Sequence, residues 1–110
     1  PVSKIRRLLE PGPIVLVSSA WKGATNIMTM GWHTVMEFEP SLIGCMISSG
    51  NHSFGMIKAS KECVINIPTV EMAETVVGCG NCSGRDTDKF AAFGLTPEPA
   101  ACVAAMACRR

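Results

Sequence analysis

The feature that most constrains the fold of this chain is a pair of strand-like segments joined by a short turn. Residues 14–19, Ile-Val-Leu-Val-Ser-Ser, form an apolar run rich in β-branched side chains, which is typical of a buried strand. Residues 21–24 supply the turn, and residues 26–34 are predicted to form a second strand. Because strands joined by so short a turn are antiparallel, this hairpin argues against a doubly wound parallel sheet.

The rest of the chain adds two further predicted strands, with helices between them. The third strand spans residues 41–48, and the apolar composition of residues 42–47 predicts burial on both faces. The fourth spans residues 62–68 and ends at a proline. The order favours a mainly β fold, a small antiparallel barrel with peripheral helices. Helices are predicted at residues 2–9, 52–60, 71–77 and 86–93, with Gly94 as a C-cap and residues 96–99 as a loop.

Length and composition exclude several classes of protein. The 110 residues fit one domain, residues 1–110, and a hydrophobic fraction of 47% with 17% charged residues excludes a disordered chain. A net charge of +1 and scattered basic residues predict no nucleic-acid partner. No apolar run approaches the roughly 20 residues that a membrane helix needs, so no membrane association is expected. The first residues lack a signal-type apolar core, and we expect a cytoplasmic protein.

The cysteines are predicted to be reduced, buried thiols. An even number fits disulfides in a secreted domain, but Cys45 and Cys63 lie in apolar strand-like runs, where free cysteine behaves as a small hydrophobe. The pair Cys79-Gly-Asn-Cys82 lacks the second pair that a zinc site normally needs, and a redox dithiol usually opens a helix in a βαβ unit. A tight turn with incidental thiols is favoured. The six are Cys45, Cys63, Cys79, Cys82, Cys102 and Cys108.

The number of predicted strands raises a question about closure. Four strands close poorly into a barrel, and open strand edges invite pairing. Residues 100–110 are alanine-rich and follow the last predicted loop. Two explanations stay open: another chain completes the sheet, or the chain is shortened from a longer one.

Three segments combine polar residues with glycine, and together they predict one binding pocket. They are residues 25–32, 48–53 and 82–90. Taken singly, each has an ordinary explanation: a half-buried strand with Trp32 in the core, an N-cap loop, and a solvated helix start whose aspartates serve the helix dipole. Three such segments in so short a chain favour a shared pocket.

The chemistry of these segments suits an anionic, planar ligand. Residues 48–53 join a strand to a helix, and free backbone N–H groups at a helix start bind anions. Arg85 offers a planar fork for phosphate, and Lys89 adds a point charge four residues later on the same helical face. Residues 25–32 can lay one face against a flat apolar ring. No Ser-His-Asp arrangement, P-loop or dinucleotide-binding G-x-G-x-x-G is present.

These motifs carry a resemblance to a known family. The ordered set, which ends in Ser-Gly-Arg-Asp-x-Asp-Lys-Phe, covers positions 11 to about 99 and is specific. The chain resembles the flavin reductase-like family, FMN-binding split β-barrels that include flavoredoxin-type proteins. The matching motifs lie at residues 13–18, 25–32, 48–53, 62–68 and 83–96.

The resemblance implies a homodimer of antiparallel, Greek-key-like split barrels that binds FMN non-covalently near the subunit interface. Family domains usually continue for several strands after the loop at residues 96–97, so it implies an incomplete barrel here. The flavin ring would be lined by Asn26, Met28, Thr29, Met30, Gly31 and Trp32. The ribityl chain and phosphate would be held by Ser48, Ser49, Asn51, His52 and Ser53. The flavin or its phosphate would be covered by Ser83, Arg85, Lys89 and Phe90.

The implied activity is that of an FMN-dependent NAD(P)H:flavin oxidoreductase, with the choice of NADH or NADPH left open. Because the flavin carries the chemistry, neither a catalytic acid/base side chain nor a metal is expected. One alternative is a flavoredoxin-like electron carrier that keeps FMN bound and serves a redox protein partner. The other is a truncated, non-catalytic dimer without flavin.

Overall fold

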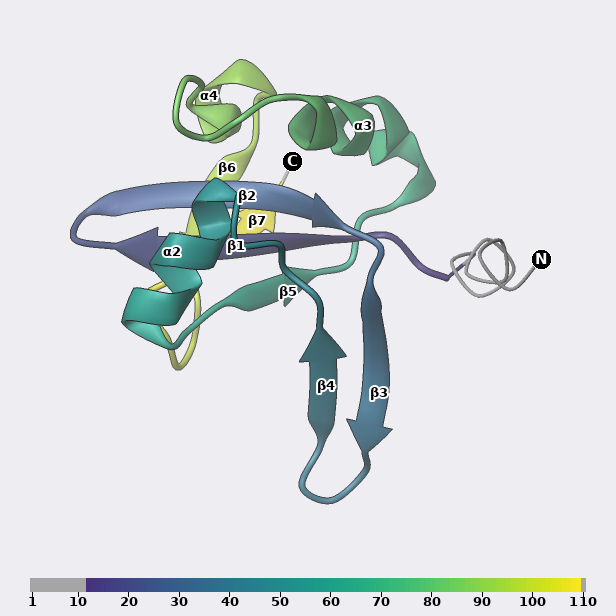
Figure 1. The fold of residues 1–110 in the computed structure, drawn as a ribbon. Coiled ribbons are helices and arrows are strands. Elements are labelled where there is room, and N and C mark those ends of the chain that lie inside the picture. Colours follow the sequence, from purple (N-terminus) through teal and green to yellow (C-terminus); the bar gives the residue numbers. More distant parts are fainter. Residues whose placement is uncertain (1–11, 110) are drawn as a thin grey trace.

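The computed structural model describes residues 12–109, and their predicted mainly β fold with helices at the periphery is confirmed (Figure 1). The predicted helix at residues 2–9 lies outside the described residues. Within the described range, no helix is long and apolar enough to cross a membrane. Three antiparallel sheets are present there: β2 (Ala24–Met30) with β1 (Val15–Trp21) and β5 (Val64–Asn66), β3 (His33–Glu37) with β4 (Leu42–Cys45), and β6 (Thr96–Pro99) with β7 (Met106–Arg109).

The predicted hairpin is confirmed as β1 and β2, with a tighter turn than expected. Trp21 pairs with Ala24, so the turn consists only of Lys22 and Gly23. Both turn residues have positive φ, 50° at Lys22 and 80° at Gly23, as a two-residue type I′ turn requires. Strand β5 pairs with the other edge of β1, also antiparallel, so β1 is the central strand of its sheet.

The prediction of one strand over residues 26–34 is wrong in its extent. β2 ends at Met30, and the chain leaves the sheet at Gly31 and Trp32 before β3 begins at His33. β3 and β4 then form a separate hairpin that projects from the body of the molecule (Figure 1).

The predicted burial of residues 42–47 on both faces is also wrong. Leu42 and Ile43 are 49% and 50% exposed, because no described element packs closely on the projecting hairpin. Apolar composition therefore did not indicate a core position here. Cys45, at the end of this hairpin, and Cys63, before β5, are exposed rather than buried.

Helix α2 (His52–Ser60) has the predicted bounds. It packs on β1, and its Ser53 and Met56 are buried. The helix ends at Lys61, whose φ of 63° is left-handed and whose backbone N–H donates to the Ile57 carbonyl at 2.8 Å. The start of α2 lies beside β2, since the Asn26 side chain of β2 donates a hydrogen bond to Ser53 of α2.

The two other helices differ in extent from the prediction. Helix α3 (Ala73–Asn81) follows the 3₁₀ turn η2 (Val70–Met72) and continues past the predicted end at residue 77. Helix α4 (Lys89–Ala92) begins later than predicted. Asp88 is its N-cap, since the Asp88 carboxylate accepts a hydrogen bond from the Ala91 backbone N–H at 3.2 Å.

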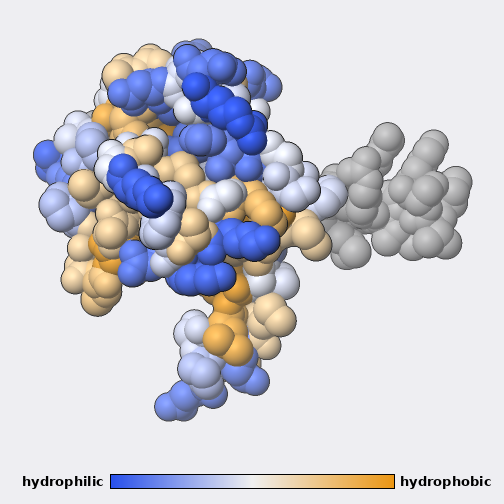
Figure 2. Space-filling view, turned by 60° about the vertical axis from the view of Figure 1, so that its left-hand side comes forward, coloured by the Kyte–Doolittle hydropathy of each residue, from blue (hydrophilic) through white to orange (hydrophobic). Residues whose placement is uncertain are grey.

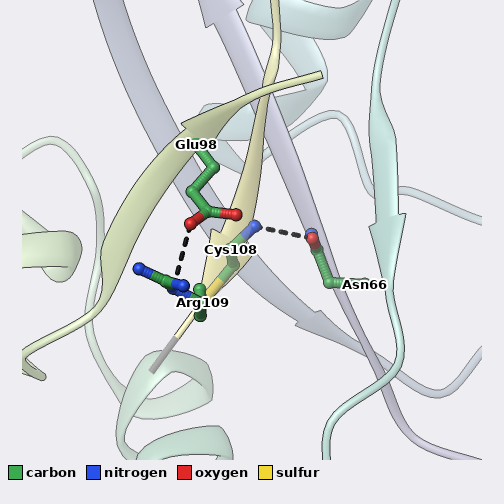
Figure 3. A network of polar contacts seen from close by, with 4 residues as sticks. All are labelled: Asn66, Glu98, Cys108 and Arg109. Atoms are coloured by element: carbon green, nitrogen blue, oxygen red, sulfur yellow. Dashed lines mark hydrogen bonds and ion pairs between the residues drawn. The ribbon is translucent and has the colours of Figure 1, made fainter. Parts of the chain in front are cut away.

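Residues 96–99, predicted as a loop, form β6 and pair with β7 near the end of the described chain. A side chain of β5 and an ion pair between the two strands hold this pair in place (Figure 3). The Cys108 backbone N–H donates to Asn66 Oδ1 at 2.8 Å, and Arg109 pairs with Glu98 at 2.9 Å. The alanine-rich segment has little strand propensity of its own, so local pattern did not reveal β7.

The central sheet buries apolar side chains on both faces. Because neighbouring side chains of a strand point to opposite faces, Leu16 faces α3 and α4, whereas Val15 and Val17 face the side of α2. The first cluster consists of Leu16, Ile27, Val76, Cys79, Phe90 and Leu95. The second consists of Val15, Val17 and Met30, with Met28, Ile47, Ile57 and Ile65 packed against it.

We expect Ile27→Ala to lower the free energy of unfolding by about 2–5 kcal/mol, because Ile27 is fully buried and truncation leaves a cavity. Ile67→Ala is the matched control: Ile67 is 82% exposed, so its truncation should cost less than about 0.5 kcal/mol. Urea unfolding followed by circular dichroism measures both. Equal losses in the two variants would contradict the assigned core.

Candidate ligand-binding site

Two adjoining cavities lie where the three predicted segments meet. The first has a volume of about 260 Å³ and the second about 420 Å³. Met28 and Asn51 belong to the walls of both, so the cavities share a boundary. Residues 25–32, 48–53 and 82–90 each contribute to these walls, so the structure brings the three segments together.

The first cavity is polar and lies at the edge of the central sheet beside β2. The start of α2, the end of α3 and the loop that follows α3 form its walls. Among the described residues that line it, none is an aspartate or glutamate, whereas one is an arginine and one a lysine. It is lined by Asn26, Met28, Gly50, Asn51, His52, Ser53, Gly80, Asn81, Cys82, Ser83, Gly84, Arg85 and Lys89.

Lys89 is the most unusual residue of this polar cavity. It is 5% exposed, and its Nζ donates to the Cys79 carbonyl at 2.8 Å. No carboxylate within residues 12–109 pairs with it. A buried ammonium without a counter-ion is costly. The arrangement therefore suits a ligand that brings a negative charge into the cavity.

Arg85 is placed differently from the prediction. It lies in the turn before α4 rather than on one helical face with Lys89, because α4 begins only at Lys89. Arg85 is exposed, and its Nη1 donates to the Gly50 carbonyl at 3.2 Å. Its backbone N–H donates to Ser83 Oγ at 3.2 Å. The guanidinium thus bridges the two loops that face each other across the cavity.

Asn26 connects all three segments. Its Nδ2 donates to Ser53 Oγ at 2.8 Å, and both residues are buried. Gly84 lies directly against the Asn26 side chain, so a Cβ at this position would collide with the Asn26 amide. The absence of a side chain at Gly84 is what lets the loop after α3 approach β2 so closely. Asn26 was predicted to line the flavin ring, but it lies in the polar cavity.

The start of α2 contributes backbone donors. Asn51 occupies the N-cap position, and its side chain makes no capping hydrogen bond. The first N–H groups of a helix have no partner inside the helix, and they carry the positive end of its dipole. Because Asn51, His52 and Ser53 line the polar cavity, this helix start adds to the positive potential there.

The second cavity is mainly apolar, and its wall includes the side chains of three methionines and one tryptophan. Trp32 is exposed and lines this cavity, so the ordinary explanation that places Trp32 in the core is wrong. The Thr29 hydroxyl donates to the Val76 carbonyl at 2.6 Å and ties β2 to α3. The lining contains no titratable side chain. It consists of Met28, Thr29, Met30, Gly31, Trp32, Met46, Ser48 and Asn51.

Two predicted site residues are not brought into either wall. Phe90 is buried in the core cluster that faces α3, which follows from its place on the inner side of α4. Ser49 is exposed in the turn before α2 and lines neither cavity. Sequence reasoning missed several lining residues, and the glycines among them were the available signal: Met46, Gly50, Gly80, Asn81, Cys82 and Gly84.

All six cysteines are free thiols in the structure. Cys79 is buried, as predicted, and burial raises the pKa of its thiol above the ordinary value. Within residues 12–109, no three His, Cys, Asp or Glu side chains are grouped so that they could hold a metal ion. The site chemistry therefore rests on its cations, hydroxyls, amides and backbone N–H groups.

Residues 6–109 match the family described as flavin reductase like domain. The chain belongs to this family. Two curated members share 33% identity with it over 91 residues: the protein YddH of Escherichia coli and a protein of Pyrococcus abyssi. The alignments cover 81% and 83% of this chain but 48% and 53% of those proteins. The chain thus spans about half the length of the curated relatives that it matches.

Solved structures agree with this membership. The flavoredoxin of Desulfovibrio vulgaris is 28% identical with a TM-score of 0.84, over 87% of this chain and 53% of that one. An FMN-binding domain of a flavin reductases-like enzyme from Shewanella baltica is 27% identical with a TM-score of 0.84. The match covers 98% of this chain and 57% of that domain's chain. The predicted split-barrel fold class is confirmed by these matches.

We expect Gly84→Ala to destabilise the protein by about 1–3 kcal/mol, because the added Cβ collides with the Asn26 amide and must displace the loop. Gly55→Ala is the matched control. It meets no atom within 4 Å and lies inside α2, where alanine favours the helix by about 0.5–1 kcal/mol. Thermal unfolding of both variants measures the difference, and a loss of stability in Gly55→Ala as large as in Gly84→Ala would refute the packing argument.

Proposed function

We propose that this chain binds FMN across the two cavities and acts as an FMN-dependent NAD(P)H:flavin oxidoreductase. The observation that carries the proposal is the polar, carboxylate-free cavity joined to an apolar one. Family membership supports it, as does the similarity to the FMN-binding domain from Shewanella baltica. Because the chain spans about half of its relatives' length, the activity of the whole protein is part of the proposal.

The polar cavity suits the phosphate of FMN. Arg85 offers a fork of N–H donors, and the buried ammonium of Lys89 lacks a counter-ion among the described residues. The start of α2 adds uncapped backbone N–H groups. A phosphate there would compensate the Lys89 charge, which no carboxylate among residues 12–109 compensates.

The apolar cavity suits the isoalloxazine ring. Met28, Met30 and Trp32 offer flat or adaptable apolar surfaces. Asn51 and Met28 lie in both walls, so the ribityl chain would cross between the cavities at these residues. In this placement Ser48 and Gly31 lie at the ring and His52 and Ser53 at the phosphate.

The protein's part in the reaction is positional. Bound FMN would supply the redox chemistry by taking a hydride from the nicotinamide and passing the electrons on. The described residues that line the apolar cavity include no titratable side chain, so they would orient the ring and exclude water rather than transfer protons. Arg85, Lys89 and the start of α2 hold the phosphate end and so set where the ring lies.

An electron carrier is the second candidate function. The similarity to the flavoredoxin of Desulfovibrio vulgaris favours it, and the same site residues would serve it. In that case FMN stays bound, a redox protein partner exchanges electrons with it, and no nicotinamide site is needed.

A homodimer is part of the proposal because the β3–β4 hairpin has no partner among the described elements. A two-stranded hairpin is marginally stable alone in water, and this one projects from the body with apolar surface at its base (Figure 2). The exposed large apolar residues of the hairpin and of the position that follows it are Val35, Met36, Phe38, Leu42, Ile43 and Met46. A second copy would cover them, and Met46 would carry that interface to the apolar cavity.

The absorbance spectrum of the purified chain after desalting tests FMN binding. A retained flavin band supports it, and its absence after incubation with excess FMN contradicts it and favours the truncated dimer without flavin. Steady-state oxidation of NADH and NADPH with added free FMN then separates the two candidates. Rapid turnover supports the reductase, and no turnover by a stably yellow protein supports the carrier.

We expect Arg85→Ala and Lys89→Met each to weaken FMN binding roughly tenfold or more, because each removes a charged partner of the phosphate. Riboflavin, which has no phosphate, should bind the variants and the unchanged protein alike. Lys58→Ala is the control, since Lys58 is exposed on α2 away from both cavities. Titration followed by fluorescence measures the affinities, and an equal loss for both ligands would show that the phosphate assignment is wrong.

We expect the chain to be a dimer in solution and Ile43→Glu to make it monomeric, because a charge in the hairpin cannot be buried at an interface without a large cost. Val77→Glu is the control, since Val77 is an exposed apolar residue of α3 outside the hairpin. Light scattering after gel filtration gives the masses. A monomeric unchanged chain, or dissociation by both variants, would count against the hairpin interface.

A further inference from the structure

Two cysteines that the proposed function does not use lie at the end of α3, beside the polar cavity. Cys79 is in the last turns of the helix, 1% exposed, and belongs to the core cluster. Cys82 is the C-cap residue, is partly exposed and lines the cavity. One thiol is therefore reached through the cavity, and the other lies behind it in the core.

The end of α3 places Cys82 about one helical turn after Cys79. The Cys82 thiol donates to the Gly78 carbonyl at 3.4 Å, so its sulfur folds back over the helical turn that carries Cys79. Residues three apart on a helix are neighbours with Cβ atoms about 5–6 Å apart, and a disulfide needs this separation to shorten to about 3.5–4.5 Å. Burial raises the pKa of Cys79, Lys89 lowers it, and the Cys82 and Cys108 thiols raise it further.

We propose that Cys79 and Cys82 are an oxidation site at which hydrogen peroxide forms a disulfide, and that this disulfide weakens anion binding in the polar cavity. The formation of the disulfide depends only on the two thiols and not on the proposed function. The second part rests on the proposed function, because it takes FMN as the ligand of that cavity.

Cys82 reacts first because it faces the cavity through which peroxide enters. Its thiolate attacks one peroxide oxygen, and the O–O bond breaks. The products are a sulfenic acid on Cys82 and a hydroxide ion, and the hydroxide takes up the proton that the thiol had lost and becomes water. The Cys79 sulfur then displaces the hydroxyl group from the Cys82 sulfur, which forms the S–S bond and releases a second water. Both thiols lose one electron each, and peroxide is reduced to water.

The disulfide requires a change in the cavity wall. The Cys82 sulfur must leave the Gly78 carbonyl and turn inwards to Cys79, which moves the backbone of the loop that follows. Gly84 in that loop has no free space against Asn26, so the movement cannot be absorbed there. Arg85, the next residue, is therefore displaced from its bridge to Gly50.

The disulfide is tested on the full chain, reduced and then treated with hydrogen peroxide, by peptide mass spectrometry. We expect a Cys79–Cys82 bridge with the loss of two hydrogen atoms, absent in Cys82→Ser and in Cys79→Ala. Cys102→Ser is the control, since Cys102 is exposed in the tail and the bridge should persist without it. A bridge from Cys79 to Cys108, or over-oxidation of Cys82 without any bridge, would overturn the proposal.

The effect on the cavity is tested by FMN titration of the reduced and oxidised chain. We expect at least about a fivefold loss of affinity on oxidation, reversed by dithiothreitol and absent in Cys82→Ser. By linkage, FMN should disfavour the bridge by the same factor. Equal FMN affinity in both states would overturn the second part. If neither state binds FMN, the proposed function fails while the mass spectrum still decides the disulfide.

Discussion

The arrangement of this protein depends on the burial of β1 from both sides. Residues 15–19 are buried in succession, so helices must cover both faces of the central sheet. α2 lies on one face and α3 on the other, and both contact β2, an edge strand of this sheet. The first residues of α2 and the last residues of α3 therefore meet beyond β2. The polar cavity is a consequence of how this sheet is covered.

Among the described residues that line this cavity, the charged side chains are those of Arg85 and Lys89, and both are basic. Lys89 and Arg85 donate hydrogen bonds to backbone carbonyls, and the carboxylate of Asp88, next to Lys89 in sequence, caps α4 instead. A carbonyl oxygen compensates an ammonium only partly. The protein thus holds positive charge that a bound anion would stabilise, and the thiols at the end of α3 lie next to the same wall.

Local pattern was most reliable where local physics decides the structure. The hairpin of β1 and β2 follows from β-branched residues on either side of a glycine-containing turn, and α2 has the bounds that its spacing predicts. It failed where distant contacts decide. The exposure of Leu42, the strand at residues 96–99 and the core position of Phe90 all depend on which elements pack against them.

For the candidate site, the amino-acid sequence by itself determined the inventory: three polar segments with glycine, two cations in the third, and the motifs that indicate the flavin reductase like family. Only the tertiary structure decided which of these residues share a wall. It placed Asn26 with the cations rather than at the apolar cavity, and it buried Lys89 without a carboxylate partner in the described part of the chain. The reason is that residue type sets what a side chain can bind, whereas burial and neighbours, which come from segments distant in sequence, set what it does bind.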